Sequence, residues 1–186
     1  GELVHPHAKS AGFKINTKKT FEKPKIGLTI AIAPTKNIDR FEFFLEKAVE
    51  LGVSRVIPLK CDRSERKNIR HDRAEKAVLA ATKQSMRAFL PQVDELTQMK
   101  KLPELIDMNE CYIAHCENAE KISVHQISSV NNPCILIGAE GDFSPEEIKW
   151  ATEQGAKALD LGTNRLRTET AGIFAVAAIL KNAIQC

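Results

Sequence analysis

Short apolar runs and amphipathic segments alternate along most of the chain. The first run, IGLTIAIA (26–33), is rich in β-branched residues and has the length of a buried strand. The segment 37–52 that follows has apolar residues at the i, i+3, i+4 and i+7 spacing of a helix, namely Phe41, Phe44, Leu45 and Ala48. Gly52 then predicts where this helix ends.

The same alternation continues towards the C-terminus. Strands are expected at 54–60, 91–96, 110–116, 133–140 and 156–162, and helices at 70–88, 101–108, 144–155 and 169–185. Ser144, Pro145 and Glu147 form a complete helix start, with an N-cap, a proline at the first position and a capping box. Such alternation predicts an α/β fold, a mostly parallel sheet with helices on both faces.

The first 25 residues do not follow this pattern. They are rich in lysine, contain short strand-like pieces without a helical period, and end in a Lys/Pro linker. A segment this short does not form a hydrophobic core of its own. We therefore predict two units: 1–25 as the end of a small β-rich module with its linker, and 26–186 as the α/β domain.

The composition is that of an ordinary globular protein. The chain has 186 residues, of which 43% are hydrophobic and 27% charged. No apolar run approaches the roughly 20 residues of a membrane span, and the N-terminal residues lack a signal-peptide pattern. Five cysteines without a CxxC pair favour reduced thiols, and the histidines lack metal-ligand spacing. We expect a cytoplasmic protein with no metal and no membrane contact.

Positive charge is concentrated in the N-terminal part of the chain. Residues 1–60 contain 11 Lys and Arg against 6 Asp and Glu, whereas residues 134–186 contain 5 against 7. A second basic cluster, KCDRSERKNIRHDR, covers 60–73. This asymmetry suits a polyanionic partner, and a solvated charged surface is the alternative interpretation.

Two loops that follow predicted strands have unusual sequences. They are IGAEGDFS (137–144) and LGTNRLRTETA (161–171), and ligands of open α/β sheets bind at such strand ends. Their glycines allow close approach to a ligand, or simply make tight turns. The absence of GxGxxG, GxxxxGK[ST] and GxSxG argues against a dinucleotide fold, a P-loop and a hydrolase serine.

Both loops lie in longer stretches that resemble a known family. ILIGAEGDFSPEEI and LDLGTNRLRTETAGI resemble the paired signature of the bacterial 16S ribosomal RNA (uridine-N3)-methyltransferases of the SPOUT, or α/β-knot, superfamily. FLEKAVELGVSRVIPL, DRSERK and KQSMRAFLPQV resemble further family stretches in the same order. The resemblance runs from about residue 26 to the C-terminus. Three places depart from the usual motifs: Ala139 replaces proline, Asp142 replaces glycine, and Asn164–Arg165 replace Arg–Ile.

The resemblance implies a C-terminal trefoil knot, a rare exception to unknotted topology, and S-adenosylmethionine as cofactor. It also implies that 1–25 is the last piece of an N-terminal β-barrel that binds RNA. The residues expected to hold the cofactor are Leu136, Ile137, Gly138, Glu140, Gly141, Leu161, Gly162, Asn164, Leu166 and Thr170. Apolar walls with exposed backbone groups suit a neutral adenine better than a phosphate.

Methylation of uridine N3 requires loss of a proton and stabilisation of the negative charge that develops on the flanking oxygens. Arg167 is the candidate for electrostatic stabilisation. Glu169 is the candidate base, or the residue that orients Arg167. An Arg–Glu pair that only fixes the helix start, and a base supplied by water or hydroxide, remain open alternatives. The target base must be turned out of its stack.

Contacts to RNA are expected from Arg63, Arg66, Lys67, Gln84 and Arg87. Basic side chains of this kind bind phosphates and fix position more than sequence. For Arg66 and Lys67 a solvated loop is the alternative, and Trp150 and Phe143 are expected to pack in the core rather than to stack on bases.

The last predicted helix, GIFAVAAILKNAI, is apolar nearly all round and must be covered on more than one side. A homodimer interface would supply this cover, and the superfamily resemblance also implies a dimer whose active site borders the partner subunit, so we expect a homodimer. The predicted activity is methylation of a uridine N3 in 16S ribosomal RNA or the small ribosomal subunit. A catalytically inactive RNA-binding knot protein and a related knot methyltransferase acting on transfer RNA ribose are the alternatives.

Overall fold

The computed structural model describes residues 1–7, 9–129 and 132–181. Its main body is a parallel sheet with strand order β5-β4-β3-β9-β7-β10-β8, and β6 pairs with β4 beside this path. The strands are β3 (Thr29–Ile32), β4 (Arg55–Lys60), β5 (Gln92–Val93), β6 (Thr97–Gln98), β7 (Cys111–Ala114), β8 (Ile122–Ser123), β9 (Cys134–Ile137) and β10 (Lys157–Asp160). All pairs within this sheet are parallel, as the alternating sequence pattern predicts.

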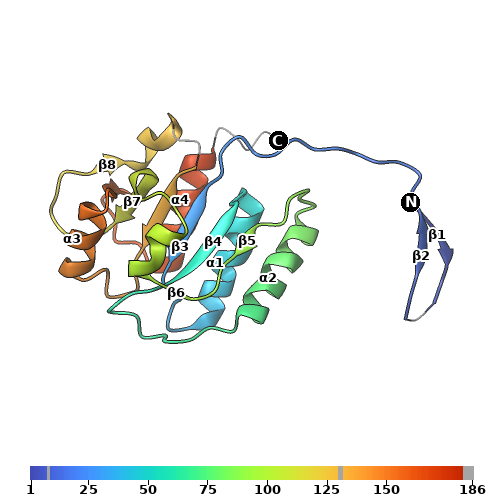
Figure 1. Ribbon diagram of the computed structural model, residues 1–186, viewed down its shortest axis with the longest axis horizontal. Coiled ribbons are helices and arrows are strands. Elements are labelled where there is room, and N and C mark those ends of the chain that lie inside the picture. Colours follow the sequence, from blue (N-terminus) through green and yellow to red (C-terminus); the bar gives the residue numbers. More distant parts are fainter. Residues whose placement is uncertain (8, 130–131, 182–186) are drawn as a thin grey trace.

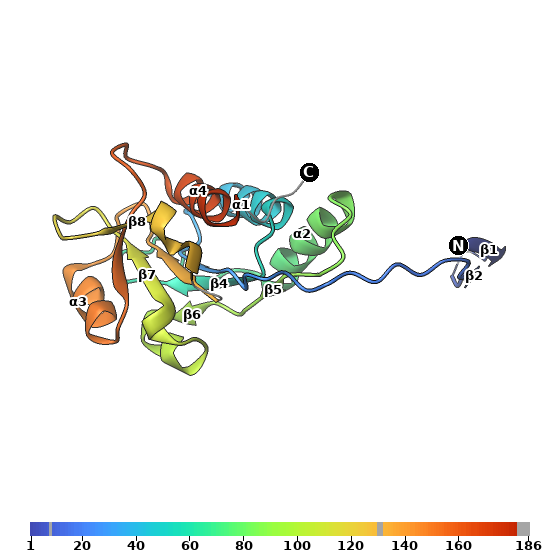
Figure 2. The ribbon, with the colours of Figure 1, turned by 90° about the horizontal axis from the view of Figure 1, so that it is seen from above.

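Helices cover both faces of the sheet (Figures 1 and 2). One face holds α1 (Ile38–Leu51), α2 (His71–Gln84), α4 (Thr168–Leu180) and the 3-10 helix η3 (Val124–Ser129). The other face holds α3 (Pro145–Glu153) and the 3-10 helices η1 (Met99–Glu104) and η2 (Met108–Glu110). Within the described ranges, none of the helices has the length and apolar character needed to cross a membrane.

Two hydrophobic cores lie on opposite faces of the central strands. Ile30 and Ile32 of β3 belong to the core beneath α1, whereas Ala31 and Ala33 belong to the core beneath α3. This alternation follows from the two-residue period of a strand, which directs neighbouring side chains to opposite faces. All four residues are fully buried, so β3 is a central strand as its continuous apolar run predicts.

The helix boundaries follow the predicted signals closely. The Asn37 side chain accepts a hydrogen bond from the Asp39 N–H at 3.0 Å, and Gly52 ends α1 with a φ of 113°. The capping box between Ser144 and Glu147 is present at the start of α3. α2 ends at Gln84, four residues earlier than predicted, and 182–185 of the last predicted helix lie outside the described residues.

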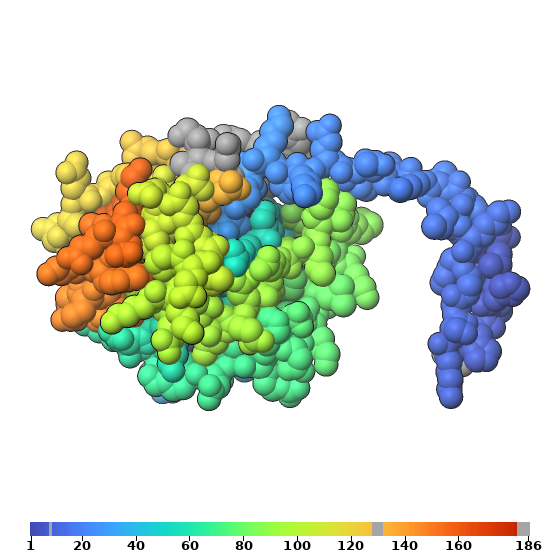
Figure 3. Space-filling view, in the orientation of Figure 1, coloured from blue at the N-terminus to red at the C-terminus, as the bar shows by residue number. Residues whose placement is uncertain are grey.

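The N-terminal segment forms a small hairpin apart from the main body. β1 (Glu2–His5) and β2 (Gly12–Lys14) pair antiparallel, and an extended segment joins them to β3 (Figures 1 and 3). Phe13 is 67% exposed and Leu3 50% exposed, so the hairpin has no core of its own.

Candidate active site

A cavity of about 850 Å³ opens where β7, β9 and β10 end and α4 begins. Such a volume is typical of sites for small organic ligands and cofactors. The lining comprises 114–116, 137–140, Asp142, 159–169, Ala171, Arg40 and Lys121. Both loops singled out in the sequence therefore meet at one cavity, although 16 residues (145–160) separate them along the chain.

Most of the residues predicted to hold the cofactor lie in this lining. They are Ile137, Gly138, Glu140, Leu161, Gly162, Asn164 and Leu166. Three lie elsewhere: Leu136 is buried in the core beneath α3, Gly141 lies against the Arg63 side chain, and Thr170 is exposed on α4. The lining combines apolar residues such as Ile137 and Leu166 with polar residues from the loops and from the starts of α1 and α4.

The 138–142 loop is fixed by contacts at both ends. The Thr168 hydroxyl, which is buried, donates to the Gly138 carbonyl at 3.2 Å. Glu140 Oε1 accepts a hydrogen bond from the Lys36 N–H at 2.9 Å. A Cβ at Gly138 would lie 3.0 Å from the Phe143 nitrogen, so a larger residue there would require the 142–143 backbone to shift by a few tenths of an ångström. The start of α4 and the loop after β3 thus fix the position of the 138–142 loop.

The second loop, 161–167, turns at Gly162, whose φ of 105° favours glycine. Asp160 Oδ1 accepts a hydrogen bond from the Gly162 N–H at 2.9 Å and stabilises the turn. Asn164, Arg165 and Arg167 are exposed at the cavity rim. Long polar side chains are therefore available to a ligand from this side.

The two predicted catalytic residues differ in their surroundings. Arg167 is the exposed N-cap residue of α4, and its side chain makes no cap hydrogen bond. Glu169 is only 9% exposed and lies in the first turn of α4, where the helix dipole favours negative charge. The Arg40 Nε lies 4.0 Å from Glu169 Oε1, so α1 contributes a cation that the sequence analysis did not include.

The end of β7 forms a wall of the cavity that the sequence analysis also missed. His115 and Cys116 line this wall, and the Lys121 ammonium donates to the His115 carbonyl at 2.7 Å. His115 is 8% exposed, and burial together with the Lys121 charge lowers the pKa of its imidazole, so it is neutral at pH 7. Burial and the neighbouring Asp142 charge raise the pKa of the Cys116 thiol.

Charge in the cavity is mixed rather than of one sign. The lining contains four basic residues and four acidic ones, namely Arg40, Lys121, Arg165 and Arg167 together with Glu140, Asp142, Asp160 and Glu169. This arrangement suits a ligand that carries charges of both signs better than a triphosphate. Within the part of the chain that the structure describes, no cluster of three His, Cys, Asp or Glu side chains could hold a metal ion.

The residues predicted to bind RNA do not form one patch. Arg63 donates from Nη1 to the carbonyls of Gly141 at 2.9 Å and Phe143 at 3.1 Å. Arg66 donates from Nε to the Thr35 carbonyl at 2.9 Å. Both arginines therefore brace the loops around the cavity, and their guanidinium groups are already engaged with backbone.

The other three lie on different parts of the surface. Lys67 lines a second cavity of about 510 Å³ beside Trp150. Gln84 is the last residue of α2 and Arg87 follows it, so both lie about 20 Å from the first residue of this 14-residue helix. Arg87 donates from Nη1 to the Val49 carbonyl at 2.9 Å, and burial lowers its pKa. Arg87 thus caps the C-terminal end of α1.

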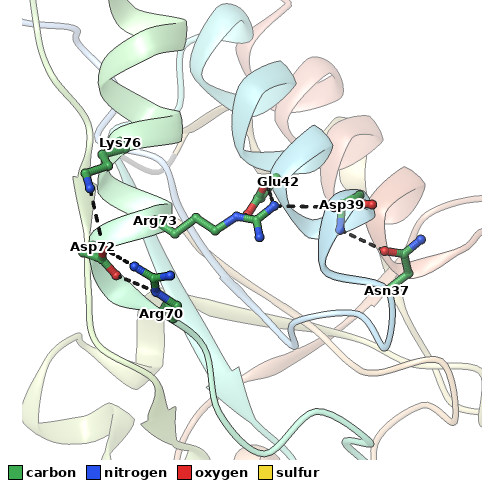
Figure 4. A network of polar contacts seen from close by, with 7 residues as sticks. All are labelled: Asn37, Asp39, Glu42, Arg70, Asp72, Arg73 and Lys76. Atoms are coloured by element: carbon green, nitrogen blue, oxygen red, sulfur yellow. Dashed lines mark hydrogen bonds and ion pairs between the residues drawn. The ribbon is translucent and has the colours of Figure 1, made fainter.

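Arginines of the basic segment 60–73 are also largely paired (Figure 4). Arg70 lies 2.8 Å from Asp72, and Arg73 binds Glu42 and lies 3.5 Å from Asp39. The Arg73 contacts join α1 to α2, whereas the Arg70 pair is local to the start of α2, and surface pairs of this kind add little stability each. These guanidinium groups are therefore already engaged with carboxylates of the same chain.

The fold and the cavity together define a cofactor-binding α/β domain. Residues 22–180 match the model of the RNA methyltransferase domain. Ribosomal RNA small subunit methyltransferase E of Mesomycoplasma hyopneumoniae is 32% identical over 165 residues, which cover 86% of this chain and 71% of that protein. The protein of the same name from Rickettsia conorii is 29% identical over 170 residues, covering 89% and 69%. The chain therefore belongs to the ribosomal RNA small subunit methyltransferase E family.

Solved structures agree with this assignment. A probable rRNA-methyltransferase from Porphyromonas gingivalis superposes with a TM-score of 0.85 at 34% identity, covering 98% of this chain and 78% of that one. Ribosomal RNA small subunit methyltransferase E from Neisseria gonorrhoeae, bound to S-adenosyl methionine, superposes with a TM-score of 0.75 at 29% identity, covering 84% and 66%.

Proposed function

We propose that this protein transfers a methyl group from S-adenosylmethionine to N3 of a uridine in 16S ribosomal RNA. The observation that carries the proposal is the cavity at the ends of β7, β9 and β10, where the two signature loops meet. Family membership and a relative solved with S-adenosyl methionine support it. Ribosomal RNA, free or within the small subunit, is the proposed partner, which places the protein in the cytoplasm.

The residues of the cavity fit this cofactor. Ile137, Leu161 and Leu166 supply apolar contact for an adenine ring, and Gly138 and Gly162 leave backbone groups accessible. The mixed charges of the rim suit the amino and carboxylate groups of a methionine moiety. When bound, the cofactor supplies an electrophilic methyl group on a sulfonium centre.

Side chains of this protein would stabilise the uridine as its N3 loses a proton. Arg167, exposed at the rim, is placed to stabilise negative charge on a uridine oxygen as N3 loses its proton. Glu169 acts as the base or orients neighbouring arginines, and its 4.0 Å contact with Arg40 of α1 favours the orienting role. In that case water or hydroxide takes the N3 proton.

Lys67 and Gln84 are the RNA contacts that stay available to phosphates, since both are exposed. Arg63, Arg66 and Arg87 support the loops and α1 through their backbone hydrogen bonds, and they would reach RNA only with their remaining N–H groups. Residues 1–25 form a separate appendage, and we assign them an accessory role in RNA binding beside the 26–186 domain.

We further propose a trefoil knot at the C-terminus and a homodimer that buries part of α4. Nine residues of α4 are buried within its own chain, so the apolar helix needs less cover than its sequence predicts. Ile173 and Phe174 are only partly buried and are the candidates for the dimer contact. Light scattering at micromolar concentration tests this, because a monomer would contradict it.

Nucleoside mass spectrometry tests the activity directly. Ribosomal subunits and transfer RNA from a strain that lacks the enzyme are incubated with S-adenosylmethionine and protein, and we expect 3-methyluridine in 16S RNA only. Arg167→Ala should lower the rate at least about 100-fold, the scale of losing an electrostatic stabiliser. The control Lys149→Ala on α3, outside the cavity lining, should keep the rate. Methylated ribose in transfer RNA, or cofactor binding without methylation, would support the alternatives.

A further inference from the structure

Asp142 has a backbone conformation that its residue type rarely adopts. Its φ is 64°, in the left-handed region, and Met86 is the other non-glycine residue with a positive φ in the described ranges. Aspartate tolerates this region better than most residues because its short side chain forms local hydrogen bonds. Strain of this kind persists only where the surrounding contacts hold it.

The Asp142 carboxylate makes those contacts with both of its oxygens. Oδ1 accepts a hydrogen bond from the Phe143 N–H at 2.8 Å, and Oδ2 accepts one from the Cys116 N–H at 2.7 Å. The first bond is local, but the second joins the loop after β9 to the end of β7, 26 residues away in sequence. Charge-assisted bonds of this length are stronger than those between neutral groups.

The hydrogen bond between Asp142 and Cys116 lies just beyond the last backbone pairing of β7 with β9. The parallel register of β7 and β9 ends with the pair Ala114 and Ile137. Beyond it the chain enters the cavity wall at His115 and Cys116, and Asp142 lines the same cavity. The carboxylate therefore continues the link between the strands after their backbone ladder has ended.

Two residues that depart from the motif of the resembled family line this cavity. Asp142 stands where glycine is usual, and Arg165 stands in the Asn164–Arg165 pair that replaces Arg–Ile. Arg165 and Asp142 line the same cavity as Cys116, and their charges act in opposite directions on the pKa of the Cys116 thiol. Glycine would suit the left-handed backbone, but it has no side chain to reach Cys116.

We propose that Asp142 is a positioning residue that fixes the end of β7 as a wall of the cofactor cavity and thereby sets the affinity for S-adenosylmethionine. The inference rests on the proposed function of the cavity. Asp142 acts through the Cys116 and Phe143 backbone and takes no part in methyl transfer. Its removal should raise the KM for the cofactor and leave kcat within about twofold.

Two substitutions separate the carboxylate from the backbone conformation. Asp142→Gly keeps a residue suited to the left-handed φ and removes both hydrogen bonds, so the variant should fold. Asp142→Asn keeps the shape of the side chain. Its amide has a single acceptor oxygen, so it replaces only one of the two carboxylate oxygens that accept hydrogen bonds from the Phe143 and Cys116 N–H groups. We expect the Kd for S-adenosylmethionine by calorimetry to rise about tenfold in Asp142→Gly and about threefold in Asp142→Asn. Glu146→Gln, which removes an exposed carboxylate from α3, is the matched control and should leave the Kd unchanged.

Hydrogen–deuterium exchange gives a readout that needs no ligand. The amides of 115–121 should exchange at least about fivefold faster in ligand-free Asp142→Gly than in the wild type, while those of β3 stay unchanged. Equal exchange and equal Kd in both proteins would overturn the proposal. A wild-type protein that binds no S-adenosylmethionine would contradict the proposed function instead, and the exchange of 115–121 would still decide whether Asp142 orders the end of β7.

Discussion

Gly172→Ala tests how closely α4 packs on the rest of the domain. A Cβ at this position would lie 2.6 Å and 2.8 Å from two ring atoms of Phe44 and 2.9 Å from Ile32 Cδ1. Phe44 and Ile32 are both fully buried, so neither side chain has free space to move into. Alanine gains about 1 kcal/mol of helix propensity over glycine, whereas overpacking of a filled core costs about 1–3 kcal/mol. With two buried neighbours displaced, we expect a net loss of about 1–2 kcal/mol in the free energy of unfolding.

Urea unfolding followed by circular dichroism measures this loss as a lower midpoint at constant slope. For a domain of this size the melting temperature should fall by about 2–8 °C. Phe44→Leu removes the ring atoms that clash, so Gly172→Ala should cost less in that background, with a coupling of about 0.5–3 kcal/mol. A Gly172→Ala protein more stable than the wild type would refute the reasoning, because the helix would then have room to spare.

Three other side chains give further tests. Iodoacetamide at pH 8 should alkylate the exposed Cys116, and saturating S-adenosylmethionine should slow this reaction because Cys116 lines the cavity. Cys61, whose pKa is raised by burial, should stay unmodified in the same peptide mass spectra. Arg87→Met removes the hydrogen bond to the Val49 carbonyl and should lower the free energy of unfolding by about 1–2 kcal/mol in urea; an unchanged midpoint would contradict the capping role. The lowered pKa of His115 means that the unfolded chain binds more protons than the folded one, so stability falls as the pH drops below about 6.5. His115→Gln should therefore lose less stability than the wild type between pH 7.5 and 5.5, and identical pH profiles would count against this.

Local signals in the sequence predicted much of the fold. Asn37 and Gly52 mark the ends of α1, and the Ser144–Glu147 box marks the start of α3, because each signal acts within one helical turn. The two-residue strands β6 and β8 escaped prediction, since they are too short to show a period. Strand ends with glycines likewise predicted which loops would line the cavity.

The remaining parts of the site depend on tertiary contacts that no local pattern reveals. Arg40 reaches Glu169 from a helix 129 positions earlier in the numbering, and nothing in its own segment indicates this. The end of β7 at His115 has neither a glycine nor a charge motif. Arg63 and Arg66 were predicted to bind RNA but donate hydrogen bonds to backbone carbonyls. The sequence does not distinguish these two roles, because an arginine looks the same in both.

The position of β3 in the sheet has a consequence for how the protein is made. β3 pairs on one side with β4, but its other neighbour is β9, with Thr29 opposite Cys134. Ribosomes add about 5–20 residues per second, so the roughly 100 intervening residues take about 5–20 s to synthesise. For that time one edge of the most apolar strand has no partner, and α4, which covers it, is completed later still. We therefore expect the nascent chain to expose this strand edge, which is a site for association with other chains, until β9 has been made.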